Sequence, residues 1–597
     1  MFQSFDQASS TEHGPKRLDQ LRAELRDHQL DGFIVPRADK HQGEYVAPHD
    51  ERLAWLTGFT GSAGFCIALG TEAGVFIDGR YRVQVKAQVA PCLTPVHWPE
   101  TSPAQWLKDT LGEGVVGFDP WLHTPNEIDA IKRGLAGSQI SLTPCENMID
   151  RIWEDQPAPP MGQIEPYPLE LAGVSYQDKC AMVAQKLREN TQSAAVITLP
   201  DSLCWLLNVR GSDVAHNPVA HGFVVVDSAA KVHLFAHADK LTTLGAHFGS
   251  DVTLHDPSAL EDHLSELKGT VSVDAGSVPM AILHMLDKHG VSYDLGHDPC
   301  AIPKARKNPT ELAKARESHL RDAGVMCEFL AWVDAQPIGD LTEIDVAKQL
   351  ESMRMATGLL RDISFESIVG SGPNAALPHY RVSTQSNRTL QNGEVLLVDS
   401  GGQYLDGTTD ITRTIAIGDQ SDEVKRAFTR VLKGMIAVSR LKFPKGVAGC
   451  DLDAFARAAL WAAGQDFNHG TGHGVGHYLS VHEGPQRLSR ISKVPFEQGM
   501  ILSNEPGFYK EGHFGIRIEN LIIVQDADLS EDANLNALYD FETLTYVPID
   551  RRMIIADMLN SDERDWINAY HATCRDKMNT RVSDETRIWL DEATQQI

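Results

Sequence analysis

The sequence predicts two related α/β domains followed by a larger α+β domain. Its 597 residues exceed what one hydrophobic core usually supports, so two to four domains are expected. A short pattern near the start recurs 150 residues later, from Leu53 to Leu203, which indicates two copies of one domain type. The second half carries strand-like segments with carboxylates at or near their ends, and these indicate a third domain of a different kind.

The repeated pattern is LAWL with a Gly-Ser pair in the first copy and LCWL with a Gly-Ser pair in the second, at residues 53–62 and 203–212. A helix-like stretch and an apolar strand precede each copy, and another strand follows it. A chance Trp-Leu match would not bring the same flanks. The strands are expected at residues 32–35, 75–77, 194–197 and 223–226.

Two segments mark domain boundaries. DQPAPP at residues 155–160 is typical of a linker, and a second boundary falls near 304–308, before a helix that opens at Pro309. The predicted domains are an α/β domain I, a related α/β domain II, and an α+β domain III with a C-terminal extension from about residue 551, with bounds 1–160, 161–305 and 306–597.

Five residues of domain III lie in settings typical of metal ligands: Asp399, Asp410, His473, Glu505 and Glu519. Asp399 ends the apolar run VLLV before Ser-Gly-Gly, and Asp410 lies among β-branched residues at alternating positions. Glu505 follows MILSN, and Glu519 follows a strand-like alternation after a glycine-rich turn. The carboxylates are therefore expected on strands, with the strands of Asp399 and Asp410 paired.

Charge arithmetic favours two metal ions. Burying four ionised carboxylates is prohibitive unless cations neutralise them, and two divalent ions bring four positive charges, with His473 neutral. Oxygen-rich ligation with one imidazole favours manganese first, with cobalt or zinc as substitutes. Such a pair, about 3.5–4 Å apart, activates water and polarises a carbonyl, so hydrolysis is the expected reaction. A single carboxylate would more often cap a turn; five ligands in compatible settings favour the metal site.

The segment HGTGHGVGH at residues 469–477 places histidines every four residues, as on one helical face. Its four glycines make a helix improbable, and an extended segment that approaches a ligand closely is expected. We assign His473 to metal and His469 to the substrate pocket, and expect His477 to be a structural or solvated histidine. The other pocket candidates, which can stabilise an oxyanion beside two metals, are His379 in LPHY and His482 in VHEGP.

Several of these strings resemble the signature segments of the pita-bread metallopeptidases, the superfamily of aminopeptidase P, prolidase, methionine aminopeptidase and creatinase. They are LPHY, VDSGGQYLDGTTDITRT, HGTGHGVGH, VHEGP, NEPGFY and GIRIEN. Within this superfamily the chain resembles the long, three-domain cytosolic form of aminopeptidase P. The resemblance covers nearly the whole chain, including DGRY at 78–81 and WINAYH at 566–571.

The resemblance implies two creatinase/prolidase-N-like domains and a pita-bread catalytic domain. It implies an aminopeptidase that releases the N-terminal residue from peptides with proline at the second position, using a hydroxide that bridges two metal ions. Glu505 would handle the proton, while His379 and His482 would hold the developing charge. His469 and Arg80, the latter reaching the site from domain I, would contact substrate. Without the resemblance, Arg80 would be interpreted as a surface arginine.

Two alternatives stay open. A prolidase restricted to dipeptides would have a shorter chain without the three-domain layout. A non-catalytic peptide-binding module is the other, because pita-bread domains of histone chaperone subunits bind partners without hydrolysis; the five ligands count against it and against metal-free creatinase chemistry. A methionine aminopeptidase would need no such N-terminal half. No motif encodes a proline pocket, so proline selectivity rests on the resemblance.

Composition limits partners and location. The net charge of −27 argues against nucleic acid or anionic membrane as a partner. No apolar run approaches the ~20 residues of a membrane span, and the N-terminus lacks a signal-peptide pattern. Nine cysteines without a CxxC pair fit reduced thiols. We therefore expect a cytoplasmic protein; the resemblance further implies a homodimer, to which the tail around Trp566, Tyr570 and Trp589 would contribute packing or a dimer contact.

Overall fold

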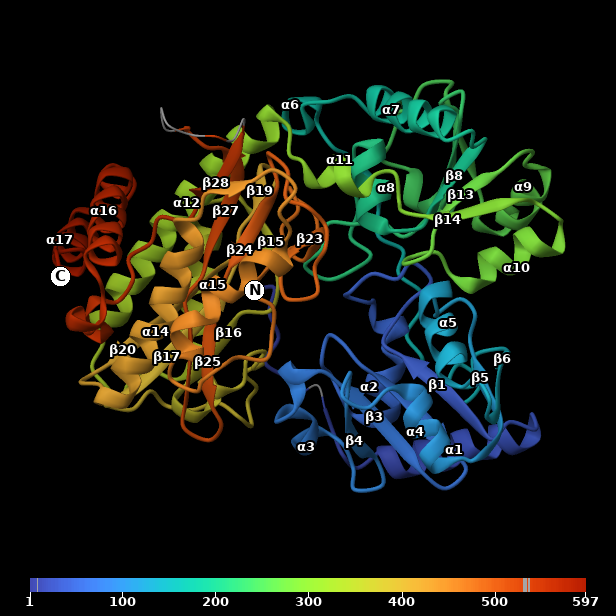
Figure 1. Ribbon diagram of the computed structural model, residues 1–597, viewed down its shortest axis with the longest axis horizontal. Helices are drawn as coiled ribbons and strands as arrows, with labels where there is room; N and C mark the ends of the chain where they lie inside the picture. The colour runs from blue at the N-terminus through green and yellow to red at the C-terminus, as the bar shows by residue number, and fades with distance from the viewer. Residues whose placement is uncertain (8, 530–533, 535–536) are drawn as a thin grey trace. The chain divides into compact units, whose positions relative to one another are not determined.

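The computed structural model describes residues 1–7, 9–529, 534 and 537–597. It contains two compact units, each described below by itself (Figure 1). One unit spans Ala8–Lys304, and the other combines Met1–Gln7 with Ala305–Ile597. The domain boundaries predicted from the sequence at 160 and 305 stay a prediction.

The first half of the N-terminal unit is a six-stranded sheet in the order β4-β3-β2-β1-β5-β6. Its central strand β1 is an uninterrupted apolar segment, so both faces are covered by helices. Leu21 of α1 and Leu56 of α2 pack with Phe33 on one face, and Leu107 of α4 and Ile128 of α5 lie in the core of the other. The elements are β1 (Gly32–Pro36), β2 (Phe65–Leu69), β3 (Ala73–Ile77), β4 (Thr94–His97), β5 (Glu113–Phe118), β6 (Gln139–Pro144), α1 (Gly14–Asp27), α2 (Arg52–Thr57), α3 (Gln84–Gln88), α4 (Pro103–Thr110) and α5 (Pro125–Gly134).

The second half of this unit repeats the design. Its sheet has the order β12-β11-β10-β8-β13-β14, in which β8 pairs antiparallel with β10 and parallel with β13, as β1 does with β2 and β5. The two Leu-X-Trp-Leu motifs lie on the equivalent helices α2 and α8, so the predicted repeat is confirmed. The elements are β8 (Ala194–Ile197), β10 (Phe223–Asp227), β11 (Val232–Phe235), β12 (Val252–His255), β13 (Val271–Asp274), β14 (Tyr293–Gly296), α7 (Tyr176–Glu189), α8 (Pro200–Leu207), α9 (Leu260–Glu266), α10 (Met280–Lys288) and α11 (Ala301–Ala305).

The C-terminal unit is α+β. It opens with α12, whose first turn carries a capping box between Asn308 and Glu311, as expected of a helix that begins at Pro309. Its strands form two three-stranded sheets, one six-stranded sheet in the order β21-β28-β27-β24-β22-β23, and the hairpin β25–β26. The helices are α12 (Pro309–Asp334), α13 (Glu343–Ala356), α14 (Asp422–Ser439), α15 (Gly449–Trp461), α16 (Ser561–Met578) and α17 (Asp584–Ala593).

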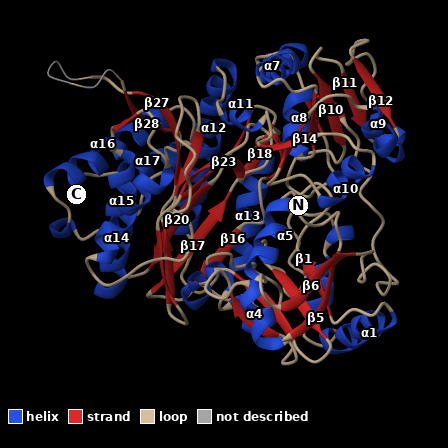
Figure 2. Cartoon of the chain, turned by 45° about the vertical axis from the view of Figure 1, so that its right-hand side comes forward, coloured by secondary structure: helices blue, strands red, loops and turns tan. Residues whose placement is uncertain are grey.

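Strand β17 (Glu394–Ser400) lies at the centre of this unit, between β16 (Ile368–Ser371) and β20 (Ile411–Ile417). Its residues alternate between two cores: Val395 and Leu397 pack with α14, whereas Leu396 and Val398 pack with α12 and α13. Figure 2 shows α14 and α15 together on one side of β17 and β20. A strand buried on both faces explains the apolar run VLLV, and the predicted fold class is confirmed.

The C-terminal unit contains further, mostly short strands. They are β15 (Leu360–Ile363), β18 (Gly402–Tyr404), β19 (Gly407–Thr408), β21 (Phe443–Pro444), β22 (Gly472–Gly474), β23 (Glu483–Leu488), β24 (Ile501–Asn504), β25 (Gly507–Lys510), β26 (Phe514–Arg517), β27 (Asn520–Asp526) and β28 (Leu538–Thr543). Helices α16 and α17 pack against α12. Within the described part of the chain, no helix combines the length and apolar character needed to cross a membrane, and the nine cysteines are free thiols.

Candidate active site

The strand pairing of the C-terminal unit brings the predicted ligands together. β17 and β20 pair antiparallel with Asp399 opposite Thr412, as expected, so Asp399 and Asp410 lie at the same end of the sheet. β24 and β27 also pair, with Asn504 opposite Asn520, which places Glu505 and Glu519 at neighbouring strand ends. Four carboxylates far apart in sequence thereby converge at the ends of two strand pairs.

The expectation that these carboxylates lie on strands holds only for Asp399. Asp410 lies in the break between β19 and β20, Glu505 directly after β24, and Glu519 between β26 and β27. A regular strand directs successive side chains to opposite faces, so a break in the ladder is what lets a carboxylate turn toward a common point. Alternation in the sequence cannot reveal such a break.

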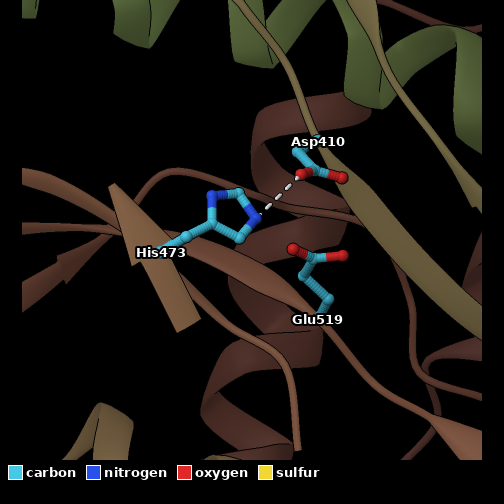
Figure 3. A group of neighbouring side chains, drawn as sticks. All are labelled: Asp410, His473 and Glu519. Carbon is cyan, nitrogen blue, oxygen red and sulfur yellow. Dashed lines mark ion pairs between the residues drawn. The ribbon is translucent and has the colours of Figure 1, made fainter. Parts of the chain in front are cut away.

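His473 lies next to the carboxylates, on the short extended strand β22, as predicted. Its Nε2 is 3.5 Å from Asp410 Oδ2 and 3.5 Å from Glu505 Oε1. Ligand atoms of Asp410, His473 and Glu519 lie within 4.8 Å of one another, and Figure 3 shows the imidazole directed at the Asp410 carboxylate, with Glu519 close by. His473 Nδ1 donates to the carbonyl of Gly474 (3.0 Å), so the neutral ring presents an unprotonated Nε2 to the carboxylates, as a metal ligand must.

Burial and repulsion raise the pKa values of the grouped carboxyls. The pKa of Asp410 is well above its ordinary value because the group is buried and because Glu519, Asp399 and Glu505 repel its charge. Burial, then Glu505 and Asp399, raise the pKa of Glu519 in the same way. Burial raises the pKa of Glu505 to about 7, with Arg517 opposing the shift. The protein alone therefore does not neutralise this cluster.

The donor set fits divalent cations. Asp399 Oδ1, Asp410 Oδ1 and Glu519 Oε1 are buried and have no hydrogen-bond partner among the described residues. Buried acceptors without donors are costly unless something positive meets them. Carboxylate oxygens with one imidazole suit hard or borderline divalent ions.

Arg517 and Tyr509 are site residues that the sequence reasoning missed. Arg517 Nη2 donates to Asp399 Oδ2 (2.6 Å), Nη1 to the Tyr509 hydroxyl (2.7 Å) and Nε to Thr412 Oγ1 (3.2 Å). The Tyr509 hydroxyl also lies 2.9 Å from His469 Nε2. A signal was available, because Arg517 stands two residues before Glu519 in GIRIEN and therefore shares its face of an extended segment.

Two hydroxyls hold the ligand side chains. Thr412 Oγ1 donates to Glu519 Oε2 (2.8 Å), and Ser503 Oγ donates to Glu505 Oε1 (3.2 Å) while accepting from the His473 amide (2.9 Å). Ser503 thus ties the histidine backbone to the glutamate side chain. Neither hydroxyl was singled out from the sequence, since serine and threonine on strands are common and carry no pattern.

The other predicted histidines take different places. The His482 ring packs against that of His473, with centroids 4.2 Å apart. His469 Nε2 contacts the Tyr509 hydroxyl, which Arg517 links to Asp399. His477 is 2 % exposed, which suits a structural histidine rather than a solvated one. His379 is half-buried in the segment that follows the short 3-10 helix Gly372–Ala376, which packs beside β26.

Arg80 belongs to the N-terminal unit. Its guanidinium forms an ion pair with Asp78, 2.7 Å away, within the turn Gly79–Tyr81. Its contact with substrate stays a prediction.

Comparison with known proteins identifies the domains. Residues 17–152 and 155–311 match models of the creatinase/prolidase N-terminal domain. Residues 313–526 match metallopeptidase family M24, and residues 537–597 match the C-terminal region of peptidase M24. A probable Xaa-Pro aminopeptidase P of Aspergillus niger is 37% identical over 606 aligned residues, which cover 98% of each chain.

The chain belongs to the Xaa-Pro aminopeptidase P family. The family member of Laccaria bicolor is also 37% identical, over 96% of this chain and 92% of its own. The crystal structure of X-prolyl aminopeptidase from Caenorhabditis elegans, described as a cytosolic enzyme with a di-nuclear active site, matches with a TM-score of 0.91 and 32% identity over 98% of this chain and 100% of that one. The resemblance predicted from the sequence is confirmed.

Proposed function

We propose that this protein is a metal-dependent Xaa-Pro aminopeptidase, which hydrolyses the bond between the N-terminal residue of a peptide and a following proline. The observation that carries the proposal is the cluster of four carboxylates and His473, whose orphaned oxygens call for cations. Full-length similarity to enzymes named for this reaction supports the substrate class. A prolidase of Thermococcus sibiricus is only 24% identical and covers 63% of this chain, so that likeness concerns the fold alone.

Two divalent ions would be held by Asp399, Asp410, His473, Glu505 and Glu519. Manganese is the expected metal because oxygen ligands dominate the set. When bound, the ions supply a nucleophile from water at neutral pH and act as a Lewis acid on the scissile carbonyl. The four ionised carboxylates then balance the four positive charges of the pair.

The protein's own groups orient and transfer protons. Glu505 would take a proton from the attacking water and pass it to the departing proline nitrogen. Its Oε1 accepts from the Ser503 hydroxyl and lies 3.5 Å from His473 Nε2, which supports this role. The imidazole of His482, packed beside His473, and that of His379 would donate hydrogen bonds to the oxygen on which negative charge develops. Arg80 and His469 would contact the rest of the peptide.

The substrates, the cellular location and the oligomeric state are also part of the proposal. The substrates would be peptides with proline at the second position. The cysteines of this chain are free thiols, and the Caenorhabditis elegans enzyme is described as cytosolic, so a cytoplasmic location is proposed. A homodimer is proposed from the family resemblance.

Metal titration tests the proposal. Metal-stripped protein should bind about two manganese ions per chain and regain activity with the second equivalent, whereas the E505Q variant should lose most activity. Cleavage that persists in an excess of chelator would contradict the metal mechanism. Stoichiometric peptide binding without cleavage under any divalent metal would favour the non-catalytic binding module.

A further inference from the structure

Helix α16 of the C-terminal region buries two polar side chains in the interior of its unit. The string WINAYH at 566–571 lies on this helix. Trp566 does pack, with its ring stacked on that of Tyr570 at 5.1 Å. Tyr570 and His571 do more, because both place a polar atom in the interior.

Helix α16 fixes the chain segment 545–549 through these two residues. The Tyr570 hydroxyl accepts from the Val547 amide (3.2 Å) and donates to a main-chain oxygen, with Val547 O at 2.8 Å and Thr545 O at 3.0 Å. His571 Nε2 accepts from the Ile549 amide (3.1 Å). Tyr570 is 5 % exposed and His571 is fully buried, so solvent cannot replace either contact.

The segment fixed in this way holds Arg413. Arg413 as a whole is 2 % exposed. Its Nε donates to Pro548 O (3.0 Å), while Nη2 donates to Val547 O (2.8 Å) and to the Tyr570 hydroxyl (3.0 Å). Its charge faces neutral oxygens, since no carboxylate of the described residues forms an ion pair with it. Such a buried charge is tolerated only when its surrounding acceptors are held in place.

The remaining nitrogen of the same guanidinium, Nη1, contacts the main chain at the proposed ligand Glu519. Arg413 Nη1 donates to the carbonyl of Glu519 (2.5 Å) and to that of Thr412 (2.8 Å), whose hydroxyl in turn holds the Glu519 carboxylate. Glu519 lies in the break between β26 and β27, and its amide donates to the Thr412 carbonyl (3.2 Å). Because Arg413 Nη1 donates to the carbonyls of both residues, it reinforces this single contact of the Glu519 backbone with β20.

We propose that Arg413 and Tyr570 are positioning residues, which couple helix α16 of the C-terminal region to the metal ligand Glu519. The inference rests on the proposed role of Glu519 as a ligand. It gives the C-terminal region a function in the metal centre itself: the region sets the backbone position of one ligand and thereby the affinity for the metal pair.

The test compares Y570F with Y546F in the full-length protein. Y570F removes the hydroxyl that Arg413 and Val547 share, whereas Tyr546 stacks on the Tyr570 ring and makes no hydrogen bond with a described residue through its own hydroxyl. Manganese affinity of the metal-stripped proteins is measured by competition with a fluorescent chelator. Y570F should bind the metal about tenfold more weakly, and Y546F should match the wild type.

R413K tests the same inference independently if Y570F folds poorly. The five acceptors named above and Asn520 Oδ1 (2.8 Å) give the Arg413 guanidinium six acceptors. R413K retains the positive charge but cannot serve all six, so it should weaken manganese binding by about 10–100-fold. In both variants kcat at saturating metal should fall while KM changes little. Equal metal affinity in Y570F, R413K and the wild type, with only a lower melting temperature of the metal-free protein, would overturn the inference.

The same experiment distinguishes a failure of the proposed function from a failure of this inference. If the wild-type protein binds no divalent metal, Glu519 is not a ligand and both proposals fall. If the wild type binds metal and the variants bind it equally well, the proposed function stands and only the coupling through α16 is lost.

Discussion

Arg517 and Asp399 form a buried ion pair at the centre of the carboxylate cluster, with Arg517 Nη2 2.6 Å from Asp399 Oδ2. Arg517 brings one positive charge to carboxylates that repel one another, and this charge opposes the rise in the pKa values of Asp410 and Glu505. It also fixes which oxygen of Asp399 is left for a cation. The other oxygen, Oδ1, has no partner among the residues that the structure describes.

Replacing Arg517 should therefore damage both stability and metal binding. Removing one partner of a buried ion pair costs about 3–5 kcal/mol, so R517M should lower the urea midpoint of the metal-free protein. Its manganese affinity should fall by about 10–100-fold, since Asp399 loses its orientation. R517K, which keeps the charge without the fork, should lie between. A wild-type urea midpoint in R517M would contradict this account.

Removing a carboxylate of the cluster should instead stabilise the metal-free protein. Burial first, and then repulsion by the neighbouring carboxylates, raise the pKa of Asp410. D410N removes this buried ionisable group, so the metal-free variant should melt on the order of 2 °C or more above the wild type at pH 8. Its metal affinity should nevertheless fall by more than about 100-fold. The matched control is D419N, at an exposed aspartate after β20. A lower melting temperature of metal-free D410N would show that Asp410 is held by unrecognised donors.

The stability of the metal-free protein should depend on pH through Glu505. Its pKa is about 7 in the fold, against an ordinary value of 4.5, so between these values the folded metal-free protein holds a proton that the unfolded chain has lost. The contribution of this group to stability is therefore present below pH 4.5 and disappears as the pH rises through 7. The melting temperature of metal-free E505Q, relative to wild type, should rise over that interval. A constant difference would sink the prediction.

Metal binding should release protons for the same reason. Because Glu505 must ionise to bind a cation, calorimetry in buffers of different ionisation enthalpy should detect more released protons at pH 6 than at pH 8. E505Q removes the proton that Glu505 contributes to this difference.

The neighbour of His482 offers a further test. Glu483 forms a buried ion pair with Lys307, with side chains 0 % and 1 % exposed. K307M should lower the free energy of unfolding by about 3–5 kcal/mol because it leaves the buried Glu483 carboxylate without the charge of Lys307. The double variant K307M/E483L should recover part of that loss. If the two single effects simply add in a double-mutant cycle, the pair contributes no coupling and the loop of His482 is held by other contacts.

Sequence reasoning identified the five proposed ligands, which the structure brings together, but not the residues that support them. Asp399, Asp410, His473, Glu505 and Glu519 carry local signals, because a carboxylate beside an apolar strand is unusual. The paired strands of Asp399 and Asp410 followed from β-branched alternation. The breaks at Asp410 and Glu519 did not, because a break is set by which residues meet across the sheet.

The supporting residues were not predicted from the sequence for a similar reason. Arg517 and Arg413 act mainly through partners that are distant in sequence, such as Asp399 and Glu519, and an arginine on a strand is ordinarily a surface residue. The roles of Tyr570 and His571 illustrate this most clearly. Their string was noticed, yet nothing within it shows that segment 545–549 or Arg413 would lie beside it. The repeat of the two N-terminal domains, in contrast, is visible as a recurring sequence pattern, and it was predicted with two of the six strands of each sheet.

The most direct test of the central claim is cleavage of an Arg-Pro-Pro tripeptide compared with an Arg-Pro dipeptide, followed by mass spectrometry. Metal-stripped protein is incubated with each peptide, with and without manganese. We predict manganese-dependent release of arginine from the tripeptide, with the dipeptide cut far more slowly. Preferential cleavage of the dipeptide would point to a prolidase, and an intact tripeptide under every divalent metal would contradict the proposal that this protein is an aminopeptidase.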